Sequence, residues 1–127
     1  MADGFRKTSG QPQRPAIVVL TGGSAAALRE VLAGIEEEGV PHVVQPGGSA
    51  DAAELAIRAA AESPLQVGVG IGAAGDVSVC HAKLEQPIFE LPAAAAPGQL
   101  RTLGHNSARI VAGLPLKTLT DRAISHL

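Results

Sequence analysis

The residues best suited to nucleophilic or metal chemistry do not form a recognisable set in this sequence. The only cysteine is Cys80, and the histidines are His42, His81, His105 and His126, with no two at the spacing of a metal-binding pair. Cys80 and His81 are neighbours in a predicted strand, where adjacent side chains point to opposite faces, so they cannot pair as nucleophile and base. We therefore expect a buried, structural Cys80, no catalytic residue and no cofactor-binding residue.

A glycine-rich turn, Gly22-Gly23-Ser24, follows the first predicted strand and invites comparison with a nucleotide site. The dinucleotide fingerprint needs three spaced glycines and an acidic residue at the end of the second strand, yet that strand ends in Gln45-Pro46-Gly47. The sequence also contains no Walker A motif. The turn is better explained as a tight strand-to-helix connection. A small metabolite- or nucleotide-binding α/β enzyme remains an alternative function.

Three consecutive carboxylates, Glu36, Glu37 and Glu38, stand at the end of the first predicted helix. Each opposes the helix dipole at a cost of about 0.3–1 kcal/mol, which solvent screening makes tolerable. The large apolar residues of this helix lie at helical spacing and predict its buried stripe: Leu28, Val31, Leu32 and Ile35. On this wheel Glu37 points almost directly away from the stripe, Glu30 shares the outward face, and Glu36 and Glu38 flank the stripe.

An outward carboxylate at Glu37 could supply one ligand to Mg²⁺ or Ca²⁺, because both ions prefer oxygen ligands. One carboxylate cannot form a metal site alone, so any such ion would be shared with another chain. The alternative is a solvated helix end with no ligand role.

The elements that would position these residues follow the order β-α-β-α-β-β-β-α. We expect strands at 16–21, 41–45, 65–71, 77–81 and 87–91, and helices ending near 38, 62 and 112. The connection 72–76 is too short for a crossover helix, so the strands on either side of it should be antiparallel neighbours. This pattern predicts one three-layer α/β/α domain with a mixed, mostly parallel sheet of about five strands.

Composition excludes several classes of function. The 127 residues carry a net charge of −2 and only two aromatic side chains, so the chain lacks the basic and stacking surface of a nucleic-acid-binding protein. No apolar run is long enough for a membrane span, and a single cysteine fits a reducing, cytoplasmic setting. We expect a disordered lead-in at 1–15, a folded domain at 16–119 and a tail at 120–127.

Three segments resemble one family. They are Leu28-Arg-Glu-Val-Leu-Ala-Gly-Ile-Glu-Glu-Glu-Gly-Val-Pro41, Ser63-Pro-Leu-Gln-Val-Gly-Val69 and Gly104-His-Asn-Ser-Ala-Arg-Ile-Val-Ala-Gly-Leu-Pro115. In order and separation they are similar to segments of the small (beta) subunit of the diol/glycerol dehydratase-reactivating factor. The resemblance covers roughly 16–119, and the first and third segments together make it fairly specific.

The resemblance implies a non-catalytic subunit of a chaperone-like reactivase. Its partners would be a large subunit with an actin-like ATPase domain and the subunits of a cobalamin-dependent diol or glycerol dehydratase. It would exchange with the dehydratase medium subunit so that damaged cobalamin can leave, and it could be associated with a bacterial microcompartment. The middle glutamate of the family's acidic segment, here Glu37, would bind a divalent cation (Mg²⁺ or Ca²⁺) shared with the large subunit.

Interface contacts are expected around that residue, at Glu30, Glu36 and Glu38. Arg109 in the third segment could donate an ion pair to a partner, or could lie solvated on its helix. The alternative within the family is a medium-subunit-like component of a cobalamin-dependent dehydratase. Those subunits are longer, with an additional N-terminal region, which favours the reactivase.

Overall fold

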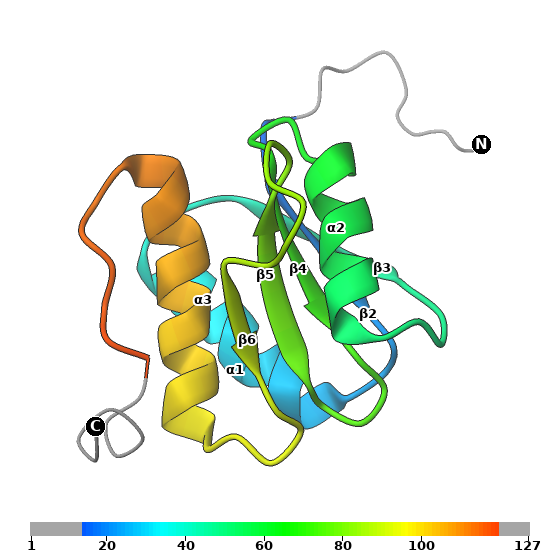
Figure 1. Ribbon diagram of the computed structural model, residues 1–127. Helices are drawn as coiled ribbons and strands as arrows, with labels where there is room; N and C mark the ends of the chain where they lie inside the picture. Colours follow the sequence, from blue (N-terminus) through cyan, green and yellow to red (C-terminus); the bar gives the residue numbers. More distant parts are fainter. Residues whose placement is uncertain (1–13, 120–127) are drawn as a thin grey trace.

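A five-stranded sheet forms the centre of the protein, as the computed structural model of residues 14–119 shows (Figure 1). Its strands, in spatial order, are β3 (His42–Pro46), β2 (Ile17–Thr21), β4 (Val67–Ile71), β5 (Val77–His81) and β6 (Phe89–Leu91). β2 pairs in parallel with β3 and β4, whereas β4–β5 and β5–β6 are antiparallel. The mixed sheet is confirmed, with its pairings divided evenly between the two kinds. The predicted tail, 120–127, and all but the last two residues of the predicted lead-in lie outside the described residues.

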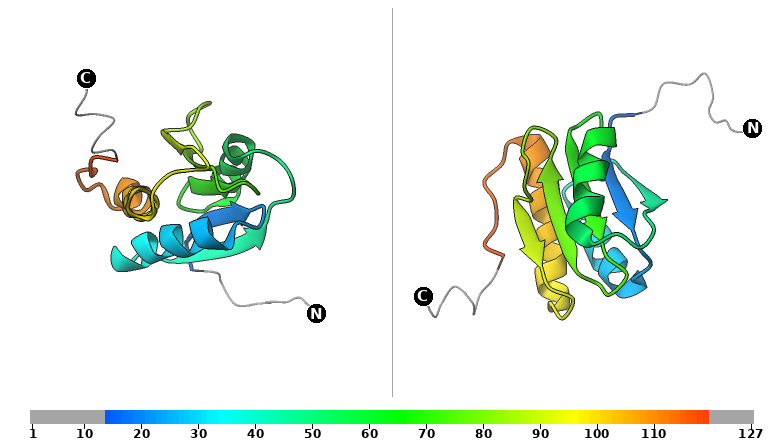
Figure 2. Two further views of the ribbon diagram at one scale, coloured as in Figure 1. Left: turned by 90° about the horizontal axis from the view of Figure 1, so that it is seen from below. Right: turned by 45° about the vertical axis from the view of Figure 1, so that its right-hand side comes forward.

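Helices cover both faces of the sheet. α1 (Ala25–Glu37) and α3 (Pro97–Ala112) lie side by side on one face, and α2 (Ala52–Glu62) lies on the other (Figure 2). The predicted three-layer α/β/α architecture is therefore confirmed. None of the helices within 14–119 is long and apolar enough to cross a bilayer.

The helix ends follow from local sequence. The side chains of Ser24 and Asp51 accept hydrogen bonds from the backbone N–H groups of Ala27 and Glu54, which caps α1 and α2. Gly39 follows α1 at φ 79°, a left-handed conformation that glycine commonly adopts just after a helix. α3 begins at Pro97, because proline is well suited to the first position of a helix.

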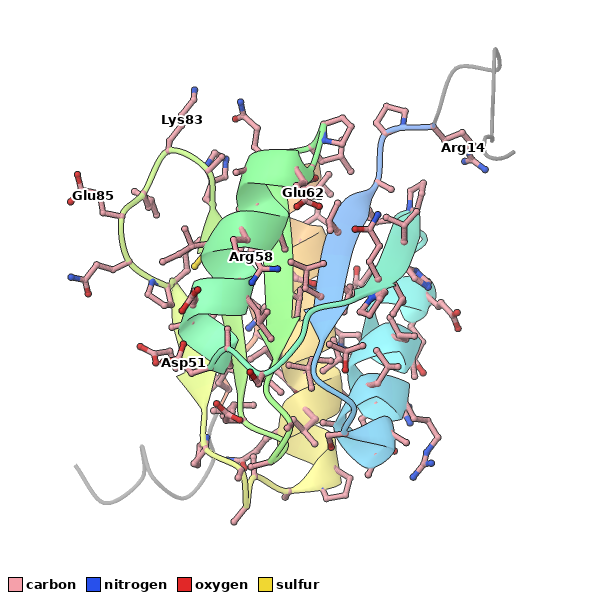
Figure 3. All side chains as sticks on the ribbon, turned by 90° about the vertical axis from the view of Figure 1, so that its right-hand side faces the viewer. Arg14, Asp51, Arg58, Glu62, Lys83 and Glu85 are labelled. Atoms are coloured by element: carbon pink, nitrogen blue, oxygen red, sulfur yellow. The ribbon has the colours of Figure 1, made fainter. Side chains whose placement is uncertain are left out.

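Successive side chains of the buried strands point to opposite faces of the sheet, so the hydrophobic core is divided between the two faces. Ile17 and Val19 pack with α1 and α3, whereas Val18 and Leu20 pack with Leu55 of α2. Glycines at 68 and 70 let α2 lie directly on β4, since a Cβ at either position would overlap the α2 backbone. Figure 3 shows this α2 face, with Arg58 and Glu62 on α2 and Glu85 on the β5–β6 loop.

The two helices on the other face approach each other through a second pair of glycines. A Cβ on Gly34 of α1 would overlap the carbonyl oxygen of Arg101, and a Cβ on Gly104 of α3 would overlap that of Val31. The buried residues of α1 are Ala27, Val31, Gly34 and Ile35. The buried face of α1 is therefore turned toward α3. It is not centred on the stripe of large apolar residues that the sequence predicted.

Candidate functional site

Because the buried face of α1 differs from the predicted one, Glu37 lies on a different side of the molecule than the sequence predicted. The helical wheel placed Glu37 opposite the buried face, but the structure places it on the flank of α1 that faces α3. The prediction was wrong because the wheel counted only large side chains and omitted Ala27 and Gly34, which are buried. The Glu37 side chain is nevertheless half exposed, at 50%. It therefore lies where α1 and α3 meet, while remaining open to solvent.

Both carboxylate oxygens of Glu37 accept a hydrogen bond from α3. Arg101 donates from Nη1 to Oε2 at 3.0 Å, and the Nε2 of His105 lies 2.6 Å from Oε1. Arg101 and His105 are four residues apart and therefore lie on the same side of α3. A carboxylate has about four lone-pair positions, so each oxygen of Glu37 keeps capacity for another ligand.

Arg101 joins two carboxylates that lie two turns apart on α1. Its Nε and Nη2 contact Oε1 of Glu30 at 3.1 and 2.9 Å, while Nη1 contacts Glu37. The Glu30 side chain is only 18% exposed. Glu30 therefore shares a face of α1 with Glu37, as predicted, but that face is turned toward α3, and the outward orientation predicted for Glu30 is wrong.

The hydrogen bonds of His105 define its tautomer. Lys117 Nζ lies 2.8 Å from His105 Nδ1, and an ammonium group can only donate. Nδ1 is then the acceptor, so the hydrogen of the neutral ring is on Nε2 and is donated to Glu37. We call the five residues Glu30, Glu37, Arg101, His105 and Lys117 the α1–α3 charge cluster.

The cluster favours the ionised form of Glu37. The hydrogen bond from His105 is the largest effect that lowers the pKa of Glu37 from its ordinary value of 4.5, and the charge of Arg101 acts in the same direction. Desolvation opposes this shift without reversing it. Glu37 is therefore a carboxylate at neutral pH, with formal charges of −1 on each glutamate balanced by +1 on Arg101 and on Lys117.

The other two glutamates of the acidic segment have separate partners. Glu38 accepts a hydrogen bond from Arg109 Nε at 2.8 Å, and Arg109 also donates from Nη1 to the carbonyl oxygen of Pro115. Glu36 is the most exposed of the three, at 66%, and lies 3.7 Å from Nε2 of His42. Within this chain, Arg109 therefore links the end of α1 to the segment that follows α3.

Asn106 fixes that following segment to α3. Its side chain is fully buried, and it both accepts from the backbone N–H of Lys117 at 2.7 Å and donates to the Lys117 carbonyl at 2.9 Å. Residues 114–118 follow α3 as a non-helical segment. The paired hydrogen bonds hold Lys117 against α3, where its ammonium reaches His105.

Within the described part of the chain, no three histidine, cysteine or acidic side chains converge in a way that could hold a metal ion. Glu37 fits the role of a single ligand, being ionised, half exposed and incompletely coordinated. Every further ligand would have to come from another molecule. Cys80 is fully buried, and burial raises the pKa of its thiol, in agreement with the structural role expected for it.

A shallow hollow lies at the carboxyl ends of β2 and β3, where a nucleotide-binding enzyme would place its ligand. It is lined by Thr21, Gln45 and Ser49 together with glycine, valine, proline and alanine. None of these lining residues carries an ionisable side chain. The glycine at 22 is explained by packing, since a Cβ there would lie 2.9 Å from the Ala73 nitrogen and 2.9 Å from the Gly48 oxygen.

Sequence reasoning did not identify Arg101, His105 or Lys117 as partners of Glu37. The usable signal was the pair of glycines inside helices, at 34 and 104. Glycine in a helix interior costs about 1 kcal/mol relative to alanine and usually has a packing reason. Two such glycines on neighbouring helices indicate close approach, which places the side chains on either side of them in contact.

Comparison with known proteins gives a consistent result. Residues 14–117 match the family described as dehydratase medium subunit. The chain is 40% identical over 107 residues to the propanediol dehydratase-reactivating factor small subunit of Citrobacter freundii. The aligned region covers 81% of this chain and 90% of the relative.

Solved structures give the same picture. A glycerol dehydratase reactivase chain has a TM-score of 0.79 and 36% identity, over 84% of this chain and 100% of that one. A second chain comes from a structure of diol dehydratase-reactivating factor complexed with ADP and Mg²⁺. It has a TM-score of 0.76 and 34% identity, with the same coverage.

Proposed function

This chain belongs to the family of dehydratase medium subunits and dehydratase-reactivating factor small subunits, and we propose that it is the small subunit of a reactivase. The reactivase would act on a cobalamin-dependent diol or glycerol dehydratase. The observation that carries the proposal is the likeness over the full length of reactivase chains. The chain itself would be non-catalytic, and nucleotide hydrolysis would belong to a large ATPase subunit.

The surface around the α1–α3 charge cluster is the proposed docking surface for the large subunit. Glu37 would contribute one oxygen ligand to a divalent cation, Mg²⁺ or Ca²⁺, whose other ligands come from the large subunit. The ion would supply a charge bridge between the two chains. Glu36 is free enough to reach a partner directly, whereas Glu30, Glu38 and Arg109 would first exchange an internal contact for an external one.

Reactivation would proceed by subunit exchange. The small subunit would leave the large subunit, and the dehydratase medium subunit, which is its relative in the family, would take the vacated place. The inactivated dehydratase would thereby loosen and release its damaged cobalamin. Nucleotide state can drive such an exchange only if the large subunit binds the small subunit with different affinity in its different states.

Affinity purification of the tagged chain tests the assembly. The chain would be produced together with a candidate large subunit and dehydratase, with and without ATP. Co-purification with the large subunit, and loss of that subunit on addition of dehydratase and ATP, would support the proposal. Co-purification with neither would remove it. Co-purification as a permanent part of the dehydratase would favour the alternative, a dehydratase medium-subunit-like component, which the family match itself raises.

The cation bridge needs its own measurement. We expect Glu37→Gln to weaken large-subunit binding in Mg²⁺, measured by calorimetry, and to remove the sensitivity of that binding to EDTA. Glu85→Gln is the matched control, because Glu85 is exposed on the β5–β6 loop, away from α1 and α3 (Figure 3). Equal affinity for the Glu37 variant and the control would contradict the bridge while leaving the folded domain and its assembly intact.

A further inference from the structure

The guanidinium of Arg101 already contacts one oxygen, Oε2, of the carboxylate that a docking cation would need. It makes three of its contacts within the α1–α3 charge cluster: two to Glu30 and one, through Nη1, to Glu37. The carboxylate of Glu30 is the more buried of the two, and that of Glu37 is half exposed. Arg101 is therefore held at Glu30 through Nε and Nη2, and only Nη1 contacts Glu37.

This division allows Glu37 to be released without freeing Arg101. Loss of the Nη1 contact leaves both contacts to Glu30 in place, so the guanidinium has a position to return to. The carboxylate meanwhile keeps the hydrogen bond from His105 to its other oxygen, Oε1. A cation arriving at Glu37 therefore competes with one charge-assisted hydrogen bond and with the positive charge behind it.

We infer that Arg101 is an internal competitor that sets the affinity of Glu37 for a cation presented by a partner. The inference rests on the proposed function, because it concerns the same carboxylate. In the free subunit Arg101 offsets part of the negative charge of Glu37 and lies at one of its oxygens, so the carboxylate attracts stray cations less strongly. In the complex the partner's cation replaces Arg101 at Glu37, and the cost of that replacement keeps the two chains separable.

The competitor role predicts that removing Arg101 strengthens docking. Arg101→Gln should tighten binding to the large subunit in Mg²⁺ by about two- to fivefold, the range given by a solvent-accessible ion pair. Arg101→Met keeps the aliphatic stem and provides a second neutral variant should the glutamine variant fail to fold. Arg101→Lys retains the positive charge and should stay closer to the unaltered chain. Arg58→Gln is the matched control, since Arg58 is exposed on α2, on the opposite face (Figure 3).

A double-mutant cycle separates this inference from the proposed function. In the Glu37→Gln background, replacement of Arg101 should no longer change the affinity, because the group for which it competes is gone. If Glu37→Gln weakens docking but Arg101→Gln leaves it unchanged or weakens it, Arg101 is not a competitor and the inference fails alone. If Glu37→Gln has no effect on docking, the cation bridge fails and the inference fails with it.

Discussion

Gly34 in α1 and Gly104 in α3 face each other so closely that a Cβ on Gly104 would lie 3.1 Å from the Cα of Gly34. Side chains of ordinary size would hold the two helices apart at this point. The contact brings the flanks of both helices together, and Arg101 and His105 reach Glu37 across them. The geometry of the α1–α3 charge cluster is thus set by two residues that have no side chain.

Alanine at either helix-contact glycine should therefore destabilise the fold. We expect Gly34→Ala or Gly104→Ala to lower the free energy of unfolding by about 1–3 kcal/mol, the cost of overpacking a tight contact. Helix propensity alone predicts the opposite sign, a gain of up to about 1 kcal/mol. Gly98→Ala is the control, because a Cβ at Gly98 in the first turn of α3 meets nothing within 4 Å. Urea denaturation measures all three, and a stabilised Gly104→Ala would contradict the contact.

Removal of the buried amide at Asn106 should release the segment after α3. Asn106→Ala abolishes both hydrogen bonds to the Lys117 backbone, and we expect a loss of about 1–3 kcal/mol. Hydrogen exchange at the Lys117 amide should accelerate relative to amides within α3. Thr118→Ala, at an exposed neighbouring position, should change neither quantity. Unchanged exchange at Lys117 in the Asn106 variant would show that the segment is held by other contacts.

Acid should reduce the stability that Glu37 contributes. Its pKa is lower in the folded chain, so the contribution is fully present above the ordinary pKa of 4.5 and is lost as pH falls through the folded value. The difference in stability between the unaltered chain and Glu37→Gln should accordingly be larger at pH 7 than at pH 3. Urea midpoints at both pH values measure it, with Glu85→Gln as reference. A difference that grows in acid would contradict the assigned hydrogen bonds.

The single thiol gives a direct probe of unfolding. Cys80 is fully buried, and the raised pKa of its thiol further suppresses the reactive thiolate. We expect labelling by a disulfide reagent to be slower in the native chain than in the denatured chain by a factor of about 10³ or more, because the thiol becomes accessible only on opening. Stoichiometric labelling of the native chain within seconds would mean that α2 opens easily from the sheet.

Much of the fold could be predicted from the sequence because its signals are local. Ser24 and Asp51 cap helices through hydrogen bonds to residues three positions away, and Gly39 adopts its left-handed conformation within a single turn. The antiparallel pairing of β4 and β5 followed from the length of the connection between them. Each of these features depends on a few consecutive residues, so the sequence pattern was sufficient.

The candidate site was harder because it depends on how two distant helices pack. The acidic segment pointed to Glu37, but its orientation depends on which side of α1 faces α3. Large apolar residues were a misleading guide, since the tightest helix contact is made by Gly34. The same reasoning could not find Arg101 or His105, which acquire their roles only through tertiary contact.

The separation in sequence of the groups around Glu37 also bears on the order of folding. The hydrogen bonds that join α3 to Glu30 and Glu37 span 64 to 71 residues, whereas the β4–β5 hairpin closes over a short turn. Loop-closure entropy makes early contacts of the longer kind improbable. We expect the hairpin to gain structure first and α3 to dock onto α1 late, so that an emerging chain acquires the geometry of the α1–α3 charge cluster only once α3 has been synthesised. Pulse-labelling hydrogen exchange that protected α3 before the hairpin would contradict this order.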